Sequence, residues 1–135
     1  FIVLAGIFSY FYIAPLNAQE ETEKPSKLLI VWTSGDREVA DKMVFMYTYN
    51  SKKAGWWNEV RLLIWGPSSK LLSEDVELQK YVKKMENAGV ELLACKACAD
   101  MYGVSEKLTE LGVDVKYMGQ PLTEMLKDGW TTMTF

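Results

Sequence analysis

Short apolar runs of strand length alternate with segments of helical spacing along most of this 135-residue chain, and this alternation constrains the fold more than any other feature. The apolar runs predict strands at residues 28–33, 60–65, 90–94, 113–118 and 130–135. The helical spacing predicts helices at residues 37–52, 73–88, 95–111, with an interruption at Gly103, and 122–127. Asp36, Ser73 and Ser105 are the candidate caps of the first helix, the second helix and the continuation after Gly103. Strands that alternate with helices in this way are typical of a parallel sheet in an α/β domain.

The pattern therefore predicts one doubly wound, mainly parallel five-stranded sheet with helices on both faces, in a flavodoxin-like arrangement. The first run, Leu28–Thr33, is apolar almost throughout, as expected for a central strand that is covered on both faces. Right-handed crossovers leave few topologies. In sheets of this kind, sites form at the carboxyl ends of the strands. Those ends are expected at residues 34–36, 66–69, 95–98 and 119–120.

Residues 28–135 are expected to form this domain, and the segment before it has another character. Residues 1–18 contain no charged residue and end in Leu16-Asn17-Ala18, which predicts a secretory signal peptide. An uncleaved N-terminal anchor is the alternative. Sixteen residues of helix would span about 24 Å, short of a hydrocarbon core of about 30 Å. Residues 19–27 are polar and predict a flexible leader. We therefore expect a periplasmic or otherwise extracytoplasmic domain, with no stable membrane insertion after signal cleavage.

The absence of histidine removes several kinds of chemistry. No Ser-His-Asp or Cys-His nucleophile, histidine metal ligand or histidine proton shuttle can form. The chain carries 15 Lys and Arg against 18 Asp and Glu, a net charge of -3. Its lysines are interleaved with acidic residues, so no basic patch for nucleic acid is expected.

The two cysteines of the chain, Cys95 and Cys98, form a C-x-x-C pair where the third strand should turn into its helix. A helix N-terminus presents free N–H donors and a partial positive charge, which favour a thiolate over a thiol. Lys96 adds a positive charge between them. The pair is therefore a candidate nucleophilic site, although an inert disulfide or simple packing would give the same spacing. Two thiolates would fill only half of a tetrahedral zinc site, so neither a metal nor another cofactor is expected.

The segment ELLACKACADMYGV, with the strand and helix units before it, resembles the DsrE/DsrF-like family. The resemblance covers about residues 27–135. It implies a small parallel α/β domain that assembles as a homotrimer or homohexamer. Members in sulfur relays carry sulfur as a persulfide on a cysteine that lies eight residues before a Gly-aliphatic pair. Cys95 has this spacing to Gly103-Val104.

Three functions are compatible with these residues. The first is sulfur handling, by a persulfide carrier or a sulfurtransferase-like protein, in which Cys95 accepts the sulfur and Cys98 resolves the persulfide. Because Cys95 is expected at the cap of the helix and Cys98 one turn inside it, Cys95 should have the lower pKa of the two. The second is a non-catalytic oligomeric binding module with a structural Cys95–Cys98 disulfide, and the third is a thiol-disulfide oxidoreductase. Self-association is expected in addition, because a monomer would have to expose one of the adjacent Trp56 and Trp57.

Overall fold

The computed structural model describes residues 25–135. The expected signal peptide, residues 1–18, and residues 19–24 of the expected leader lie outside the described residues. The first strand begins at Lys27. No helix within residues 25–135 is both long enough and apolar enough to cross a membrane.

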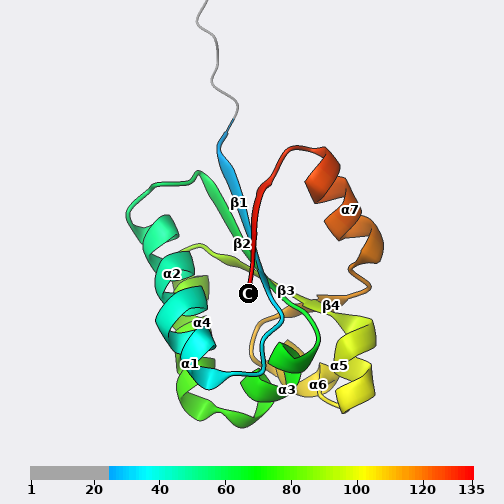
Figure 1. Cartoon of the computed structure of the whole chain (residues 1–135). Coiled ribbons are helices and arrows are strands. Elements are labelled where there is room, and N and C mark those ends of the chain that lie inside the picture. The colour runs from blue at the N-terminus through cyan, green and yellow to red at the C-terminus, as the bar shows by residue number, and fades with distance from the viewer. Residues whose placement is uncertain (1–24) are drawn as a thin grey trace, which may run out of the picture.

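Five parallel strands form a single sheet with the order β4-β3-β2-β1-β5 (Figure 1). The strands are β1 (Lys27–Trp32), β2 (Glu59–Ile64), β3 (Glu91–Cys95), β4 (Asp114–Lys116) and β5 (Thr131–Thr134). The helices are α1 (Arg37–Val39), the π-helical η1 (Ala40–Phe45), α2 (Met46–Lys53), α3 (Pro67–Glu74), α4 (Val76–Asn87), α5 (Lys96–Tyr102), α6 (Ser105–Glu110) and α7 (Gly119–Lys127). The predicted five-stranded α/β fold with helices on both faces is confirmed.

The strand order explains how the helices are distributed between the two faces. From β1 to β4 each strand is added on the same side of the one before it, so right-handed crossovers place these connections on one face. The last connection runs back past the whole sheet to β5, which places α7 on the opposite face, apart from α2 and α4 (Figure 1). One face is thus covered by most of the helices, and the other chiefly by α7.

The two faces have separate cores because side chains alternate along each strand. The larger core holds the alternate β1 residues Leu28, Ile30 and Trp32 with apolar residues of η1, α3, α4, α5 and α6. The smaller core lies beneath α7 and at the start of α5. It consists of Leu29, Val31, Leu63, Leu93, Cys95, Cys98, Met118, Met125 and Trp130.

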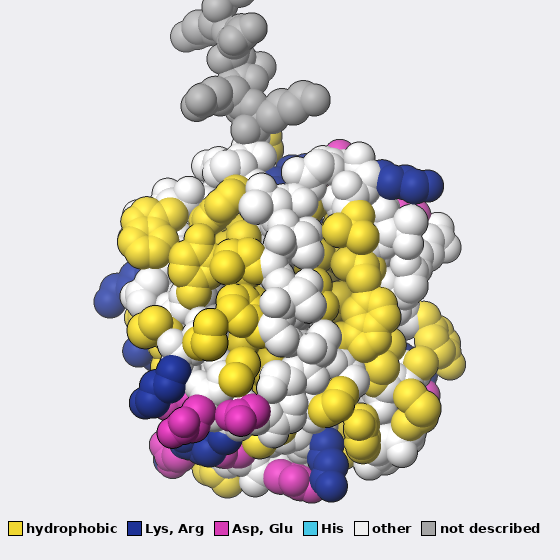
Figure 2. Space-filling view, in the orientation of Figure 1, with side chains coloured by type: hydrophobic (Ala, Val, Ile, Leu, Met, Phe, Trp, Pro, Cys, Tyr) yellow, Lys and Arg dark blue, Asp and Glu magenta, His cyan; other side chains and the backbone are white. Residues whose placement is uncertain are grey.

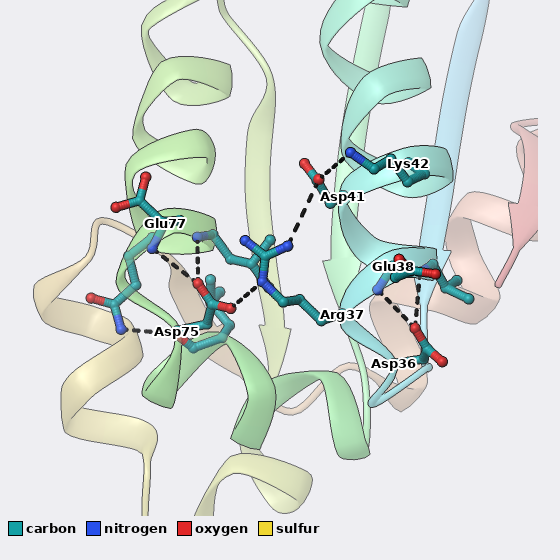
Figure 3. A network of polar contacts seen from close by, with 11 residues as sticks. Asp36, Arg37, Glu38, Asp41, Lys42, Asp75 and Glu77 are labelled. Carbon is teal, nitrogen blue, oxygen red and sulfur yellow. Dashed lines mark hydrogen bonds and ion pairs between the residues drawn. The ribbon is translucent and has the colours of Figure 1, made fainter.

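Acidic caps begin two helices of the larger face (Figure 3). Asp36 accepts hydrogen bonds from the backbone N–H groups of Glu38 and Val39, as its position after β1 predicts. Asp75 caps α4 in the same way and also accepts a hydrogen bond from Arg37 at 2.8 Å. This bond ties the start of α1 to the start of α4 (Figure 3).

Two predicted caps are wrong. Ser73 was expected to cap the helix at residues 73–88, but it lies inside α3, an additional helix that begins directly at Pro67. Proline at the first helical position has no N–H to satisfy and a favourable φ. Gly66-Pro67 therefore follows the end of the second strand, as expected, and also starts a helix that was not expected. Ser105 was expected to cap a helical continuation, but it is the first residue of α6 and its hydroxyl donates to Asp100.

Candidate functional site

Cys95 and Cys98 lie together at the carboxyl edge of the sheet, as predicted. Cys95 is the last residue of β3 and the N-cap of α5, with an extended backbone conformation. Cys98 lies one turn into α5. Both side chains belong to the smaller core, and both are free thiols.

Cys95 lies where the connections after two neighbouring strands lead to opposite faces of the sheet. The connection after β3 returns to the larger core, where Leu108 of α6 is buried. The connection after the neighbouring strand β4 leads instead to α7 on the other face. In open α/β sheets, ligands bind at the carboxyl edge where neighbouring connections diverge to opposite faces. Cys95 is therefore at the point of this sheet where a site is expected.

The two thiols are almost completely buried, with exposed fractions of 6% for Cys95 and 7% for Cys98. Their surroundings are apolar, since Leu93, Met118 and Trp65 belong to or pack against the same core. Burial of this kind limits access to small sulfur compounds or to a partner that displaces neighbouring side chains. The sequence did not predict that Met118 and Trp65 share this core with the thiols. An apolar residue that follows a strand does not reveal which core it joins.

The environment of Cys98 disfavours its thiolate. Burial raises the pKa of Cys98 above its ordinary value, and a hydrogen bond with Cys95 raises it further. The backbone N–H groups of Gly66 and of Cys98 itself act in the opposite direction but are weaker. The expected stabilisation of a thiolate by the helix N-terminus is thus outweighed at Cys98 by burial. Gly66 lies two residues after β2, in the strand end at residues 66–69 that was expected to lie at the site.

The Lys96 ammonium pairs with a carboxylate and not with either thiol. Its Nζ atom lies 2.6 Å from Oδ2 of Asp100, one turn further along α5. The Ser105 hydroxyl donates to the other oxygen of Asp100 at 2.5 Å. These two hydrogen bonds lower the pKa of Asp100, and the bond to Asp100 raises the pKa of Lys96. Lys96 is therefore held in a neutral pair, so its expected electrostatic support for the thiolates is largely cancelled.

Exposed apolar side chains lie next to the thiols along the chain. Met101 and Tyr102 follow in α5, with exposed fractions of 78% and 41%. Tyr117, directly after β4, is 67% exposed, and its ring lies 5.8 Å from the Lys96 ammonium. A surface of this composition is suited to contact with another protein.

Nothing within residues 25–135 forms a group of three or more side chains suited to hold a metal ion. The other predicted strand ends have structural roles. Ser34 accepts a hydrogen bond from the Asp36 backbone N–H, and Asp36 caps α1. The buried Ser68 hydroxyl donates to the carbonyl of Trp32 and so joins the ends of β1 and β2.

Comparisons with known proteins agree on the class of domain. A family model, the DsrE/DsrF-like family, matches residues 26–135. A solved structure of a conserved protein of unknown function from Bacteroides thetaiotaomicron is 38% identical, with a TM-score of 0.79, and the match covers 82% of this chain and 95% of that one. A structure of a protein of unknown function from Methanobacterium thermoautotrophicum shares the fold at 19% identity, with a TM-score of 0.66. The match covers 82% of this chain and 99% of that one. The curated proteins contain no match.

Proposed function

Because the chain belongs to the DsrE/DsrF-like family, we propose that it handles sulfur through a reactive cysteine, with Cys95 as the residue that accepts a sulfur atom. The observation that carries the proposal is the position of Cys95 at the end of β3, beside a second thiol and at the point where neighbouring connections diverge. The chain acts as a persulfide carrier or is sulfurtransferase-like.

Loading of Cys95 requires a donor that contains sulfane sulfur, such as thiosulfate or a polysulfide. The Cys95 thiolate attacks the sulfane sulfur, and a new S–S bond forms while the S–S bond of the donor breaks. With thiosulfate, the leaving group is sulfite and the product is a persulfide on Cys95. No oxidant is consumed, because the S–S bond of the donor is exchanged for the S–S bond of the persulfide.

Cys98 provides a route for release. Its thiolate attacks Sγ of the Cys95 persulfide, a Cys95–Cys98 disulfide forms and hydrosulfide leaves. An external thiol must then reduce the disulfide before the next cycle. The placement of both side chains in the smaller core, with Cys98 one helical turn after Cys95, supports this step. The raised pKa of Cys98 keeps it protonated while Cys95 is being loaded.

Cyanide tests this proposal, since it removes sulfane sulfur as thiocyanate. After treatment with thiosulfate or polysulfide and removal of excess donor, the wild-type protein should release close to one thiocyanate per chain. Cys95→Ser should release none, and Cys98→Ser should release as much as wild type but lose sulfur to thiols more slowly. Release by Cys95→Ser equal to that by wild type would contradict the assignment of Cys95.

A structural disulfide and a thiol-disulfide oxidoreductase remain the competing functions. A thioredoxin-type architecture does not fit, because every strand pair in the sheet is parallel and Pro121 lies in helix α7 rather than before a hairpin. The reduction potential of the pair distinguishes the two functions. A structural disulfide should lie below roughly -300 mV and a catalytic one above it.

We propose further that residues 1–18 direct export and that the domain works in the periplasm or another extracytoplasmic compartment. The support is the uncharged apolar composition of this segment. N-terminal sequencing of protein from the envelope fraction should find a mature chain that begins near Gln19. Protein that stays in the cytoplasm with residues 1–18 attached would contradict the proposal.

A further inference from the structure

A second feature of the α7 face is a pocket of about 330 Å³ between that helix and the amino half of the sheet. This volume is at the small end of ligand pockets, which run from about 300 to 1,000 Å³. The sheet side consists of residues from β1 to β4, and the helix side of residues from α7 to the start of β5. The lining residues are Lys27, Glu59, Arg61, Glu91, Leu93, Lys116, Pro121, Glu124, Met125, Asp128 and Trp130.

The charges in this pocket are unusual for their place in the fold. Lys27, Glu59, Arg61 and Glu91 project from β1, β2 and β3 on the face that α7 covers. Inward charges on edge strands often prevent edge-to-edge aggregation, but these three strands are the central ones of the sheet. Further along the same face, at Leu29 and Leu63, the side chains are apolar and fully buried. Protection of a sheet edge therefore does not explain why the amino half of this face is charged.

The internal partners of these charges are exchangeable. Lys27 pairs with Asp128 at 2.8 Å and Arg61 pairs with Glu91, and in each pair one partner is about half exposed or more. Such exposed pairs contribute little to stability and can be replaced by a ligand. The Arg61 guanidinium also lies 4.3 Å from the centre of the Trp130 ring. This stacking holds a planar donor in place at the pocket wall, suited to a carboxylate.

The balance of charge indicates what kind of ligand fits. The pocket has three cationic side chains, Lys27, Arg61 and Lys116. They are accompanied by four carboxylates, those of Glu59, Glu91, Glu124 and Asp128. A pocket with both signs and a small excess of negative charge disfavours anions such as sulfate. It favours a ligand that has an ammonium and a carboxylate close together.

One wall of the pocket lies beside the candidate nucleophile. Lys116 is the register partner of Cys95 across β3 and β4, and neighbouring strands are about 4.8 Å apart. Leu93, two residues before Cys95, points to the same face and also lines the pocket. Leu93, Met125 and Pro121 supply apolar surface to the lining, beside the charged Lys116. A ligand whose charged head lies near Arg61 would therefore direct an apolar sulfur-containing tail toward Cys95.

We propose that this pocket binds a zwitterionic thiol persulfide of amino-acid to dipeptide size, as the sulfur donor for Cys95. The reacting step rests on the proposed function. The Cys95 thiolate attacks the outer sulfur of the donor R–S–SH, the new Sγ–S bond forms, the S–S bond of the donor breaks and R–S⁻ leaves. Electrons balance without an oxidant, because one persulfide is exchanged for another.

Binding is tested apart from sulfur chemistry with unreactive thioethers. ¹⁵N-labelled protein that carries Cys95→Ser is titrated with S-methyl-L-cysteine, with 2-(methylthio)ethylamine, which lacks the carboxylate, and with 3-(methylthio)propionate, which lacks the ammonium. The zwitterion should shift the amide resonances of pocket residues, and each singly charged analogue should bind about tenfold more weakly or worse. Arg61→Gln and Glu124→Gln should each weaken binding of the zwitterion by a similar factor. Lys80→Gln, at an exposed side chain of α4 outside the pocket, is the matched control and should bind like the parent.

Three results would overturn the inference: no shifts at pocket residues, singly charged analogues that bind as well as the zwitterion, or both pocket variants binding like the parent. Glu124 is an exposed residue of α7, so its variant remains informative if Arg61→Gln does not fold. If the zwitterion fails to bind while thiosulfate still loads wild-type Cys95, the pocket assignment fails alone. If the zwitterion binds but no donor loads Cys95, the proposed function fails instead.

Discussion

The two thiols occupy similar depths in the protein but different chemical positions. Cys95 ends a strand and caps a helix, whereas Cys98 is inside that helix with a raised pKa caused by burial and by its neighbour. At neutral pH the thiolate fraction of a thiol decides how fast it is alkylated. The proposed division of labour between the cysteines therefore follows from local position rather than from exposure, which is nearly equal for both.

The first prediction is that iodoacetamide near pH 7 modifies Cys95 before Cys98 in the reduced wild type. In Cys95→Ala, Cys98 should react faster than it does in the wild type, because the hydrogen bond and charge of Cys95 no longer raise its pKa. Peptide mapping at several reaction times measures both rates. If Cys98 is modified first in the wild type, Cys95 is not the preferred nucleophile.

The second prediction concerns Asp75, whose pKa is lowered below the ordinary 3.8, first by the Leu78 backbone N–H and also by Arg37. A lowered pKa in the folded state stabilises the protein above pH 3.8, and this contribution is lost as the pH falls through the folded-state value. Asp75→Ala should therefore lower the free energy of unfolding by about 1–2 kcal/mol at pH 7. In urea titrations the difference from wild type should shrink below pH 4, and a difference independent of pH would argue against a carboxylate role.

At the scale of helices and strands, the sequence predicted what depends on local patterns. All five strands and the start of α5 at the cysteines were predicted closely, because apolar runs and turn residues mark them. Helix α3 was missed, since Gly66-Pro67 is compatible with a stop and with a start. The pairing of Lys96 with Asp100 was also missed, because a local positive charge in a sequence does not reveal the direction of its side chain.

The third prediction tests how α5 ends. Gly103 caps the helix with φ of 67°, a left-handed conformation that L residues adopt at a cost. A Cβ added there would meet nothing within 4 Å, so Gly103→Ala should destabilise the domain by about 1–2 kcal/mol through backbone strain alone. Gly119→Ala is the control, because Gly119 begins α7 without a left-handed φ and its Cβ would also meet nothing. Equal stability losses in the two variants would contradict this reason.

At the scale of the molecule, large apolar side chains remain exposed at the surface. Figure 2 shows hydrophobic side chains on both sides of a central strip of backbone and other side chains. Trp56 is 59% exposed, with Met43 and Met46 about half exposed, whereas Trp57 packs partly against the larger core. Exposed apolar surface of this kind is typical of protein contacts. We therefore propose that the domain self-associates, as a trimer or hexamer by its family resemblance.

The fourth prediction is that sedimentation at micromolar concentration finds an oligomer, and that Trp56→Lys shifts it toward monomer. An ammonium at this position would have to be buried without a partner in the interface. Val76→Lys is the matched control, since Val76 is also 59% exposed but starts α4. A wild-type protein that sediments only as a monomer would refute self-association.

The central claim is that Cys95 accepts sulfur, and mass spectrometry of the intact and digested protein tests it most directly. After loading with a sulfane sulfur donor, without reductant, the chain should gain the mass of one sulfur atom, and that sulfur should map to Cys95. The gain should persist in Cys98→Ser and be absent in Cys95→Ser. A sulfur atom that maps to Cys98, or a chain that only loses two hydrogens to a disulfide under every donor tried, would contradict the account.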